Sequence, residues 1–596
     1  MNIVRFGEDS TDNLECHKYP FVGTTNPKVS VGIIHVDDVE AKDETEYERT
    51  VNWLPIPGNI DFYLVNVHWC PDNTIILETM PRSQQQIDLL RFEIGDLIRG
   101  QLVHRELADP SHWINSSQDN QIVCHSSGGT GISDLCYMLW KSERSGFMHI
   151  YCLHITLAQF HETKMSVLWE NYELVGSEEP CKAPRHASVD SLPVVHCDKL
   201  TSGKFVVQEI IDVLPERDVV YFCANIRSPI DFGIYSVDLL PFGSPKTTDS
   251  EGKLDAMLTA GMAHTCSDVQ DWGSHNQVNT VFGEHGKHSA VLNSAGSVAI
   301  DCFSSVSRSL SVHVYLSGGR NDQLQFSFER STTLWTKGAK SNENDKSSMD
   351  LFACPAADSK STLFGCIWKP LKVSDHPKPG PTVVIVYGGP HIQRVQNSAQ
   401  LAQTGGISSR LIDEGYTIIA VDNRGSANRG VAFEKGIRDR LGKIEVEDQV
   451  GRVNSLGCLV TDSVFIFIIL PTLVLMQVAA IHYLAQQGLA DANNVGIYGW
   501  SYGGYMSLMC LMTTPWLFKC AVSGAPVTDW RYYDTCYTER YIRTPQENPE
   551  GYKLSDVKAY VDHMKGGLLL VGDLTFFQLP VSCSLLKPYD LFRFTV

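Results

Sequence analysis

Short apolar runs separated by turn residues dominate the first half of the chain. Between about residue 16 and residue 345, runs of β-branched and aromatic residues alternate with clusters of Gly, Pro, Asn, Asp and Ser. Strand signals at such close spacing predict an all-β region rather than alternating strands and helices. Examples are FYLVNVHW (62–69), TIILETM (74–80), MHIYCLHI (148–155), DVVYFCANI (218–226) and SLSVHVYLSG (309–318).

A loose repeat narrows the kind of all-β fold. The sequences GFMHIYCLHI (146–155) and IDFGIYSVDLL (230–240) each end in a strand with a Tyr-x-Val or Tyr-x-Leu pattern. Spacings of tens of residues between such units suit four-stranded propeller blades better than a β-sandwich. We therefore predict a β-propeller-like domain over residues 1–345.

The pattern changes after the polar stretch KSNENDKSSMD (340–350), which we interpret as a linker. The run TVVIVYGGP (382–390) is typical of a buried strand, ISSRLIDEGYTIIAVDNRG (407–425) of a helix followed by a strand, and NNVGIYGWSYGGYMSLMCLM (493–512) of strand, turn and helix. This alternation predicts a mostly parallel sheet with crossover helices in a second domain, residues 346–596.

The motif GWSYG (499–503) supplies a candidate nucleophile. It follows a short apolar strand (495–498) and precedes a helix-like run (506–512). A serine at a tight turn between strand and helix projects its hydroxyl above the sheet when small residues flank it. Ser501 is therefore the candidate nucleophile, and the backbone N–H of Tyr502 is a candidate oxyanion donor.

Several motifs together resemble the dipeptidyl peptidase branch of the prolyl oligopeptidase family, most closely its dipeptidyl peptidase 8 and 9 subgroup. They are HKYPFVGTTNPKVSV (17–31), VYGGP (386–390), DNRGSANRG (422–430), EVEDQV (445–450), GWSYGGY (499–505) and APVTDWRYYDTCYTERY (525–541). The resemblance covers most of the chain. It implies a β-propeller followed by an α/β-hydrolase domain, and a serine peptidase that needs no cofactor or metal.

The resemblance also implies a substrate and a role for each matching residue. The substrates are peptides with Pro or Ala at the second position, from which the amino-terminal dipeptide is removed. Ser501 attacks the carbonyl, and the Tyr387 hydroxyl donates to the oxyanion, a role that suits a phenol. Aromatic faces hold a flat ring well. The residues that match the walls of the proline pocket are Val527, Trp530, Tyr533 and Tyr537.

The catalytic base and acid are where this sequence departs from the family. In this fold the triad follows the order Ser, acid, His, and the one histidine after Ser501 is His563. Because His563 precedes the apolar run 568–571, we expect it at the opposite edge of the sheet, as a surface residue. Asp573 follows that run and is a candidate acid, the alternative being a turn aspartate. We assign no catalytic His and expect the domain to be truncated at its C-terminus. Loss of triad members in serine proteases lowers the catalytic rate by roughly 10⁴ to 10⁶.

An insertion is expected at about residues 451–477, between two segments that the family joins directly. It contributes most of the uncharged run VFIFIILPTLVLMQVAA (464–480). This run is shorter than the roughly 20 residues of a bilayer span, and Pro471 interrupts it. A span here would divide one sheet between two sides of a membrane, so we favour an inserted segment over a membrane anchor.

The resemblance also implies that the first propeller blades, which carry the family's ammonium-binding glutamates, precede Met1. Glu178 and Glu179 form an acidic pair, but their surroundings do not match, and we expect a solvated loop there.

Composition limits the partners. With 49 Lys plus Arg against 68 Asp plus Glu, the net charge of -19 disfavours nucleic acid and anionic membranes. The 17 cysteines contain no CxxC pair and indicate neither a disulfide framework nor a zinc site. No secretory signal is recognisable, so we expect a cytoplasmic protein. The resemblance also implies that the protein forms a homodimer. The alternative function is a non-catalytic interaction protein that uses the propeller as a binding platform.

Overall fold

The chain divides into two units in the computed structural model. An all-β unit comprises residues 23–303 and 311–335, and an α/β unit comprises residues 1–22, 304–310 and 336–596. The domain boundary expected at residues 345 and 346 stays a prediction. The structure describes residues 2–4, 14–16, 18–34, 51–56, 61–70, 73–95, 99–124, 136–155, 197–239, 278–320, 326–337, 347–370, 379–402, 407–450 and 480–572.

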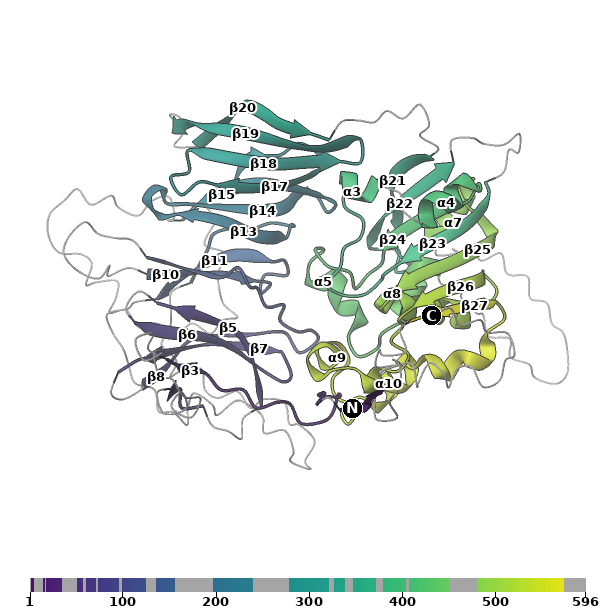
Figure 1. Ribbon diagram of the computed structural model, residues 1–596, viewed down its shortest axis with the longest axis horizontal. Helices are drawn as coiled ribbons and strands as arrows, with labels where there is room; N and C mark the ends of the chain where they lie inside the picture. The colour runs from purple at the N-terminus through teal and green to yellow at the C-terminus, as the bar shows by residue number, and fades with distance from the viewer. Residues whose placement is uncertain are drawn as a thin grey trace, which may run out of the picture. The chain divides into compact units, whose positions relative to one another are not determined.

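Four-stranded sheets follow one another along the all-β unit (Figure 1). In each of the first two sheets, every strand pairs with the next along the chain. The first sheet is β5 (Phe62–Trp69), β6 (Thr74–Pro81), β7 (Gln86–Glu93) and β8 (Arg99–Leu107). The second sheet is β9 (Gln121–Cys124), β10 (Cys136–Ser142), β11 (His149–Ile155) and β12 (Cys197–Lys199).

Two further groups of four strands follow along the chain. They are joined to each other through one parallel pair, Phe232 with Lys287. The third group is β13 (Val207–Leu214), η3 (Pro215–Arg217), β14 (Val219–Ser228), β15 (Asp231–Asp238) and β16 (Asn279–Phe282). The fourth is β17 (Lys287–Leu292), β18 (Val298–Ser305), β19 (Arg308–Arg320) and β20 (Phe326–Thr336). A short pair, β3 (Gly32–Ile33) and β4 (Asn52–Trp53), precedes the first sheet.

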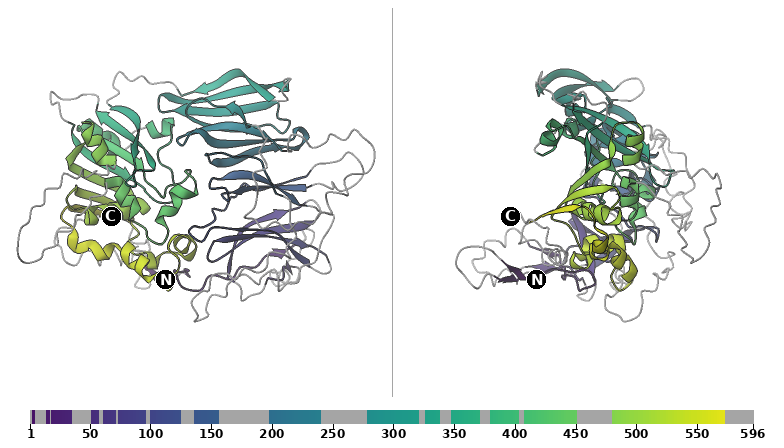
Figure 2. Two further views of the ribbon diagram at one scale, coloured as in Figure 1. Left: turned by 180° about the vertical axis from the view of Figure 1, so that it is seen from behind. Right: turned by 90° about the vertical axis from the view of Figure 1, so that its right-hand side faces the viewer.

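Neighbouring sheets of the all-β unit pack face to face. Leu139 and Ile150 of the second sheet share one apolar core with Val220 and Phe222 of the third, all four at 0 % exposure. This stacking of sequential four-stranded sheets, visible again from behind in Figure 2, is the blade arrangement of a β-propeller. The predicted propeller-like fold is confirmed.

The α/β unit is built on one seven-stranded sheet with the order β21-β22-β24-β23-β25-β26-β27. β21 and β22 are antiparallel, and β22 is antiparallel to β24, whereas the remaining neighbours are parallel. A mostly parallel sheet is therefore confirmed. The strands are β21 (Ser347–Pro355), β22 (Thr362–Pro370), β23 (Pro381–Val386), β24 (Thr417–Asp422), β25 (Asp491–Trp500), β26 (Phe518–Gly524) and β27 (Gly567–Val571). An additional pair, β1 (Asn2–Val4) and β2 (Leu14–Cys16), belongs to this unit.

Helices cover this sheet. Ala480 and Leu484 of α7 share a core with Ile419 and Val421 of β24, and α8 packs on β25 and β26. The α-helices are α3 (Ala399–Ala402), α4 (Ile407–Asp413), α5 (Val431–Glu434), α6 (Ile444–Val450), α7 (Ala480–Gln486), α8 (Tyr502–Thr513), α9 (Thr535–Ile542) and α10 (Pro549–Ser555). The 3₁₀ helices are η4 (Lys435–Ile437), η5 (Trp530–Tyr532) and η6 (Val557–His563).

The structure bears on the predicted linker, the expected insertion and the question of a membrane span. The predicted linker is wrong at its C-terminal end, because β21 already begins at Ser347. The expected insertion at 451–477 and the Glu178–Glu179 pair lie outside the described residues. None of the helices that are described has the length and apolar character needed to cross a bilayer.

One cysteine departs from the expected absence of disulfides. Cys136 is disulfide-bonded, and the register of β9 and β10 sets Cys124 directly opposite it. The other cysteines whose side chains are described are free thiols. No CxxC or other short cysteine spacing signals this bond in the sequence.

Candidate active site

Ser501 lies in a strained turn between β25 and α8. Its backbone has φ 58° and ψ −117°, and its N–H donates to the carbonyl of Gly524 at 2.9 Å. A non-glycine residue with positive φ carries backbone strain that the surroundings must hold in place. The strand, turn and helix expected around Ser501 are therefore present.

Glycines make this turn possible. A Cβ at position 499 would lie 2.2 Å from the carbonyl oxygen of Gly503, and one at 503 would lie 2.2 Å from that of Val386. A Cβ at position 389 would lie 2.6 Å from the ring of Tyr502. Backbone from three segments therefore meets at distances that only glycine allows.

Tyr502 is the first residue of α8, where backbone N–H groups have no partner within the helix. Its side chain is buried, at 2 % exposure. Its ring centroid lies 5.9 Å from that of Tyr387 and 5.5 Å from that of Trp530. Tyr502 thus joins the nucleophile turn to the other predicted site residues.

Tyr387 directly follows β23, at the same edge of the parallel sheet as Ser501. The amide of Asn423 holds the adjacent loop by donating to the carbonyl of Gly388 at 2.9 Å, and Gln449 donates in turn to Asn423 at 3.0 Å. Burial raises the pKa of the Tyr387 phenol, and nearby Tyr533 raises it further. The phenol therefore stays protonated at neutral pH and can donate a hydrogen bond.

The predicted pocket residues form an aromatic cluster. The rings of Trp530 and Tyr537 stack at 6.0 Å with an interplanar angle of 13°. Tyr533 lies 5.7 Å from Trp530 and 5.4 Å from Tyr537, each in an edge-on arrangement. Val527 is buried at 6 % exposure and precedes η5 on the same segment.

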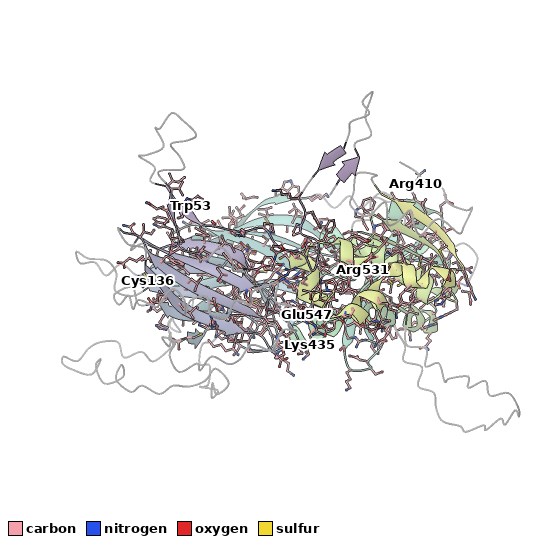
Figure 3. The ribbon with its side chains drawn as sticks, turned by 90° about the horizontal axis from the view of Figure 1, so that it is seen from below. Trp53, Cys136, Arg410, Lys435, Arg531 and Glu547 are labelled. Carbon is pink, nitrogen blue, oxygen red and sulfur yellow. The ribbon has the colours of Figure 1, made fainter. Side chains whose placement is uncertain are left out.

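Charged side chains brace this segment. Arg531, labelled in Figure 3, donates to Asp529 at 2.6 Å and to Asp556 at 2.7 Å. Lys558 donates to Asp529 at 2.8 Å. The Asp529 carboxylate is buried, at 1 % exposure, and the two cations hold its pKa below the ordinary value despite burial. This bracing ties the start of the segment that carries the aromatic cluster to the start of η6.

A buried carboxyl beneath the site was not singled out from the sequence. Glu445 of α6 accepts a hydrogen bond from the Tyr502 hydroxyl at 2.7 Å and from the Gly442 N–H at 2.9 Å, both on Oε1. Its Oε2 has no hydrogen-bond partner among the described residues. Burial raises the pKa of Glu445 to about 7. The EVEDQV motif contains this residue, but the motif alone does not distinguish Glu445 from the two other acids in it.

The triad partners are not assembled in the described part of the chain. His563 ends η6, four residues before β27, and is exposed. Because β25, β26 and β27 run parallel, the start of β27 lies at the opposite edge of the sheet from Ser501. No side chain among the described residues is hydrogen-bonded to the Ser501 hydroxyl. Asp573 lies outside the described residues.

No candidate metal site is present in the parts of the chain that are described. His, Cys, Asp and Glu side chains there do not gather in groups of three or more that could hold an ion.

A strained serine between a parallel strand and a helix, beside phenol and backbone donors, is the nucleophile turn of the α/β-hydrolase fold, here in a chain that also carries a propeller. Residues 405–458 and 476–574 match the prolyl oligopeptidase family. Residues 1–275 match the dipeptidyl peptidase IV N-terminal region. The chain belongs to this family, in the branch of the dipeptidyl peptidases. The first match breaks off at residue 458 and resumes at 476, where the sequence predicts an insertion.

Individual relatives agree with this assignment. Mouse dipeptidyl peptidase 8 is 26% identical over 622 residues, covering 98% of this chain and 60% of its own length. The venom dipeptidyl peptidase 4 of Apis mellifera is 36% identical over 196 residues, covering 32% of this chain and 21% of its own length. The crystal structure of Porphyromonas gingivalis dipeptidyl peptidase 4 has the same fold, with a TM-score of 0.68, 21% identity, and coverage of 100% of this chain and 67% of that one. The chain thus spans about 60% of the length of the dipeptidyl peptidase 8 relatives.

Proposed function

We propose that this chain is a serine dipeptidyl peptidase-like protein. Its site binds the amino end of peptides with Pro or Ala at the second position, and Ser501 is the group that attacks the following carbonyl. One observation carries the proposal, which is the aromatic cluster of Trp530, Tyr533 and Tyr537 joined through Tyr502 to the serine turn. A rigid apolar pocket of this kind suits a proline ring.

We further propose that a polypeptide of residues 1–596 turns over slowly. A serine hydroxyl is a poor nucleophile without an adjacent base, and His563 starts from the wrong edge of the sheet. Loss of triad members lowers the rate by roughly 10⁴ to 10⁶. Asp573 is retained as the candidate acid, and Tyr387 and the Tyr502 N–H as the oxyanion donors.

A fluorogenic Gly-Pro substrate tests both statements. We expect weak release of the fluorophore by the purified chain, and none above background from Ser501→Ala. Hydrolysis at the rate of an ordinary peptidase that disappears in Ser501→Ala would contradict the slow-turnover proposal.

Labelling with a fluorophosphonate probe, combined with a binding assay for Pro-containing dipeptides, separates this proposal from the alternative, an interaction protein built on the propeller. An activated Ser501 reacts within minutes, whereas an idle one reacts no faster than other surface serines. A chain that neither labels nor binds Pro-containing dipeptides would favour the interaction protein.

Location and assembly stay proposals. The free thiols support the reducing environment of the cytoplasm, whereas the disulfide at Cys136 counts against it. A homodimer is implied by the family resemblance, and light scattering of the purified chain would test it.

A further inference from the structure

Residues 19–22 pair with the segment that carries the aromatic cluster. The N–H of Val22 donates to the carbonyl of Tyr533 at 3.1 Å, and the N–H of Thr535 donates to the carbonyl of Pro20 at 3.0 Å. Between these bonds, Phe21 and Asp534 form an antiparallel bridge. Two segments from opposite ends of the sequence thus make a short two-stranded contact, and both belong to the α/β unit.

Aromatic and apolar side chains pack around this backbone contact. The ring of Phe21 lies 5.1 Å from that of Tyr19 and 6.4 Å from that of Tyr532, edge-on in both cases. Val22 is buried, at 5 % exposure. Burial raises the pKa of the Tyr19 phenol, and the Asp534 charge adds to the shift, which places Tyr19 against the same turn.

The contact lies at the turn that sets the shape of the cluster. Tyr533 directly follows η5, and Asp534 caps the start of α9 by accepting a hydrogen bond from the Tyr537 N–H at 2.8 Å. The rings of Tyr533 and Tyr537, one on each side of the turn, are 5.4 Å apart. A change in this turn therefore changes the gap between the two rings.

The turn needs a partner from elsewhere in the chain. Asp534 is extended, with φ −75° and ψ 158°, and the segment 533–535 stands between two short helices. Its backbone donors and acceptors must be satisfied from outside the helices, and residues 20 and 22 supply one acceptor and one donor.

We propose that residues 19–22 act as a positioning strap that fixes the shape of the proline pocket. The strap touches no reacting atom and acts through the backbone of Tyr533 and Thr535. It favours a flat five-membered ring at the second substrate position, because it holds Tyr533 and Tyr537 at a fixed separation. This inference rests on the proposed function, since that proposal identifies the aromatic cluster as the substrate pocket.

Val22→Pro tests the strap because proline removes the N–H that donates to Tyr533. The matched control is Thr25→Pro, which places the same residue at an exposed position three residues later. Hydrogen exchange of residues 530–542 measures the turn, and calorimetric titration with Ala-Pro and Ala-Gly measures the pocket. Phe21→Ala, which keeps all backbone bonds and removes the ring contact with Tyr532, serves as a second variant if Val22→Pro does not fold.

We expect Val22→Pro to speed exchange at the turn about tenfold, the loss of roughly one hydrogen bond, and to weaken Ala-Pro binding by a similar factor. Ala-Gly binding should change less, and Thr25→Pro should match the parent. Unchanged exchange in Val22→Pro and Phe21→Ala would overturn the strap, and so would faster exchange with unchanged Ala-Pro binding. If the parent chain does not bind Ala-Pro more tightly than Ala-Gly, the assignment of the aromatic cluster as the proline pocket is wrong. The strap proposal is then also wrong as stated, even if Val22→Pro speeds hydrogen exchange at the turn.

Discussion

Glu445 is the residue whose chemistry is least expected from its surroundings in sequence. It is fully buried, with one carboxyl oxygen bonded to Tyr502 and Gly442 and the other without a partner among the described residues. An ionised carboxylate in this position would leave charge unsatisfied in a low-dielectric interior. Burial accordingly raises the pKa of Glu445 from 4.5 to about 7, so near neutral pH a large share of the folded chains carries it protonated.

Glu445→Gln should make the stability of the α/β unit less dependent on pH. The pKa of this acid is higher in the folded chain than in the unfolded one, so its contribution is fully present below about pH 4.5 and is lost as the pH rises through about 7. Glutamine keeps an acceptor for Tyr502 and cannot ionise. The parent should therefore lose on the order of 3 kcal/mol more than the variant between pH 5 and pH 9.

Urea unfolding at a series of pH values measures this difference. Glu447→Gln on the same helix is the matched control, since Glu447 is only half-buried. Parallel pH profiles for the parent and Glu445→Gln would show that the carboxyl keeps an ordinary pKa and does not couple pH to the serine turn.

At the scale of elements, the serine turn depends on how closely β23, β25 and α8 approach. The carbonyl of Val386, at the end of β23, faces positions 499 and 503 at distances that exclude a side chain. The same crowding holds Ser501 in its strained backbone conformation. Packing of whole elements, and not the local sequence alone, keeps Ser501 in the conformation that projects its hydroxyl above the sheet.

Gly503→Ala should therefore destabilise the unit strongly. Its Cβ would lie 2.2 Å from a backbone oxygen that cannot move without shifting β23, which we expect to cost about 2 to 4 kcal/mol. Gly567→Ala is the control, because a Cβ there would lie 3.9 Å from its nearest neighbour, Cys520 Cβ. Free energies of unfolding compare the two. Equal losses would show that the turn has room to relax.

The elements themselves follow closely from the sequence. The run FYLVNVHW coincides with β5, and the strand and helix expected on either side of Ser501 lie within β25 and α8. Each is encoded locally, by β-branched runs or by glycines at a turn. The start of the antiparallel β21 was missed because three of its first four residues, Ser347, Ser348 and Asp350, are polar.

Contacts between distant segments could not be read from the sequence. The Glu445–Tyr502 bond, the pairing of residues 19–22 with the turn at Asp534, and the disulfide of Cys136 each join positions that only the folded chain brings together. Family motifs identified some of these segments without giving their roles. Periodicity reports which face of an element is buried, but not what it is buried against.

At the scale of the whole molecule, the electrostatic potential of the net charge acts on a substrate before any contact is made. The net charge of -19 produces a negative potential that extends about a Debye length, roughly 10 Å at 0.1 M salt. A peptide with a free amino terminus meets this field during its approach, and added lysines strengthen the attraction.

The peptide Ala-Pro-Lys-Lys-Lys should therefore associate faster than Ala-Pro-Glu-Glu-Glu, although both present the same dipeptide to the pocket. We expect about a tenfold difference in association rate at low salt, shrinking several-fold at roughly 0.2 M salt because counterions screen the field. Dissociation rates should differ less, since the pocket contacts are shared. Stopped-flow tryptophan fluorescence measures both rates, with Ala-Pro-Ser-Ser-Ser as the uncharged control. Association rates that are equal at all salt concentrations would mean that the acidic side chains are distributed away from the approach to the site, and that pocket shape alone governs binding.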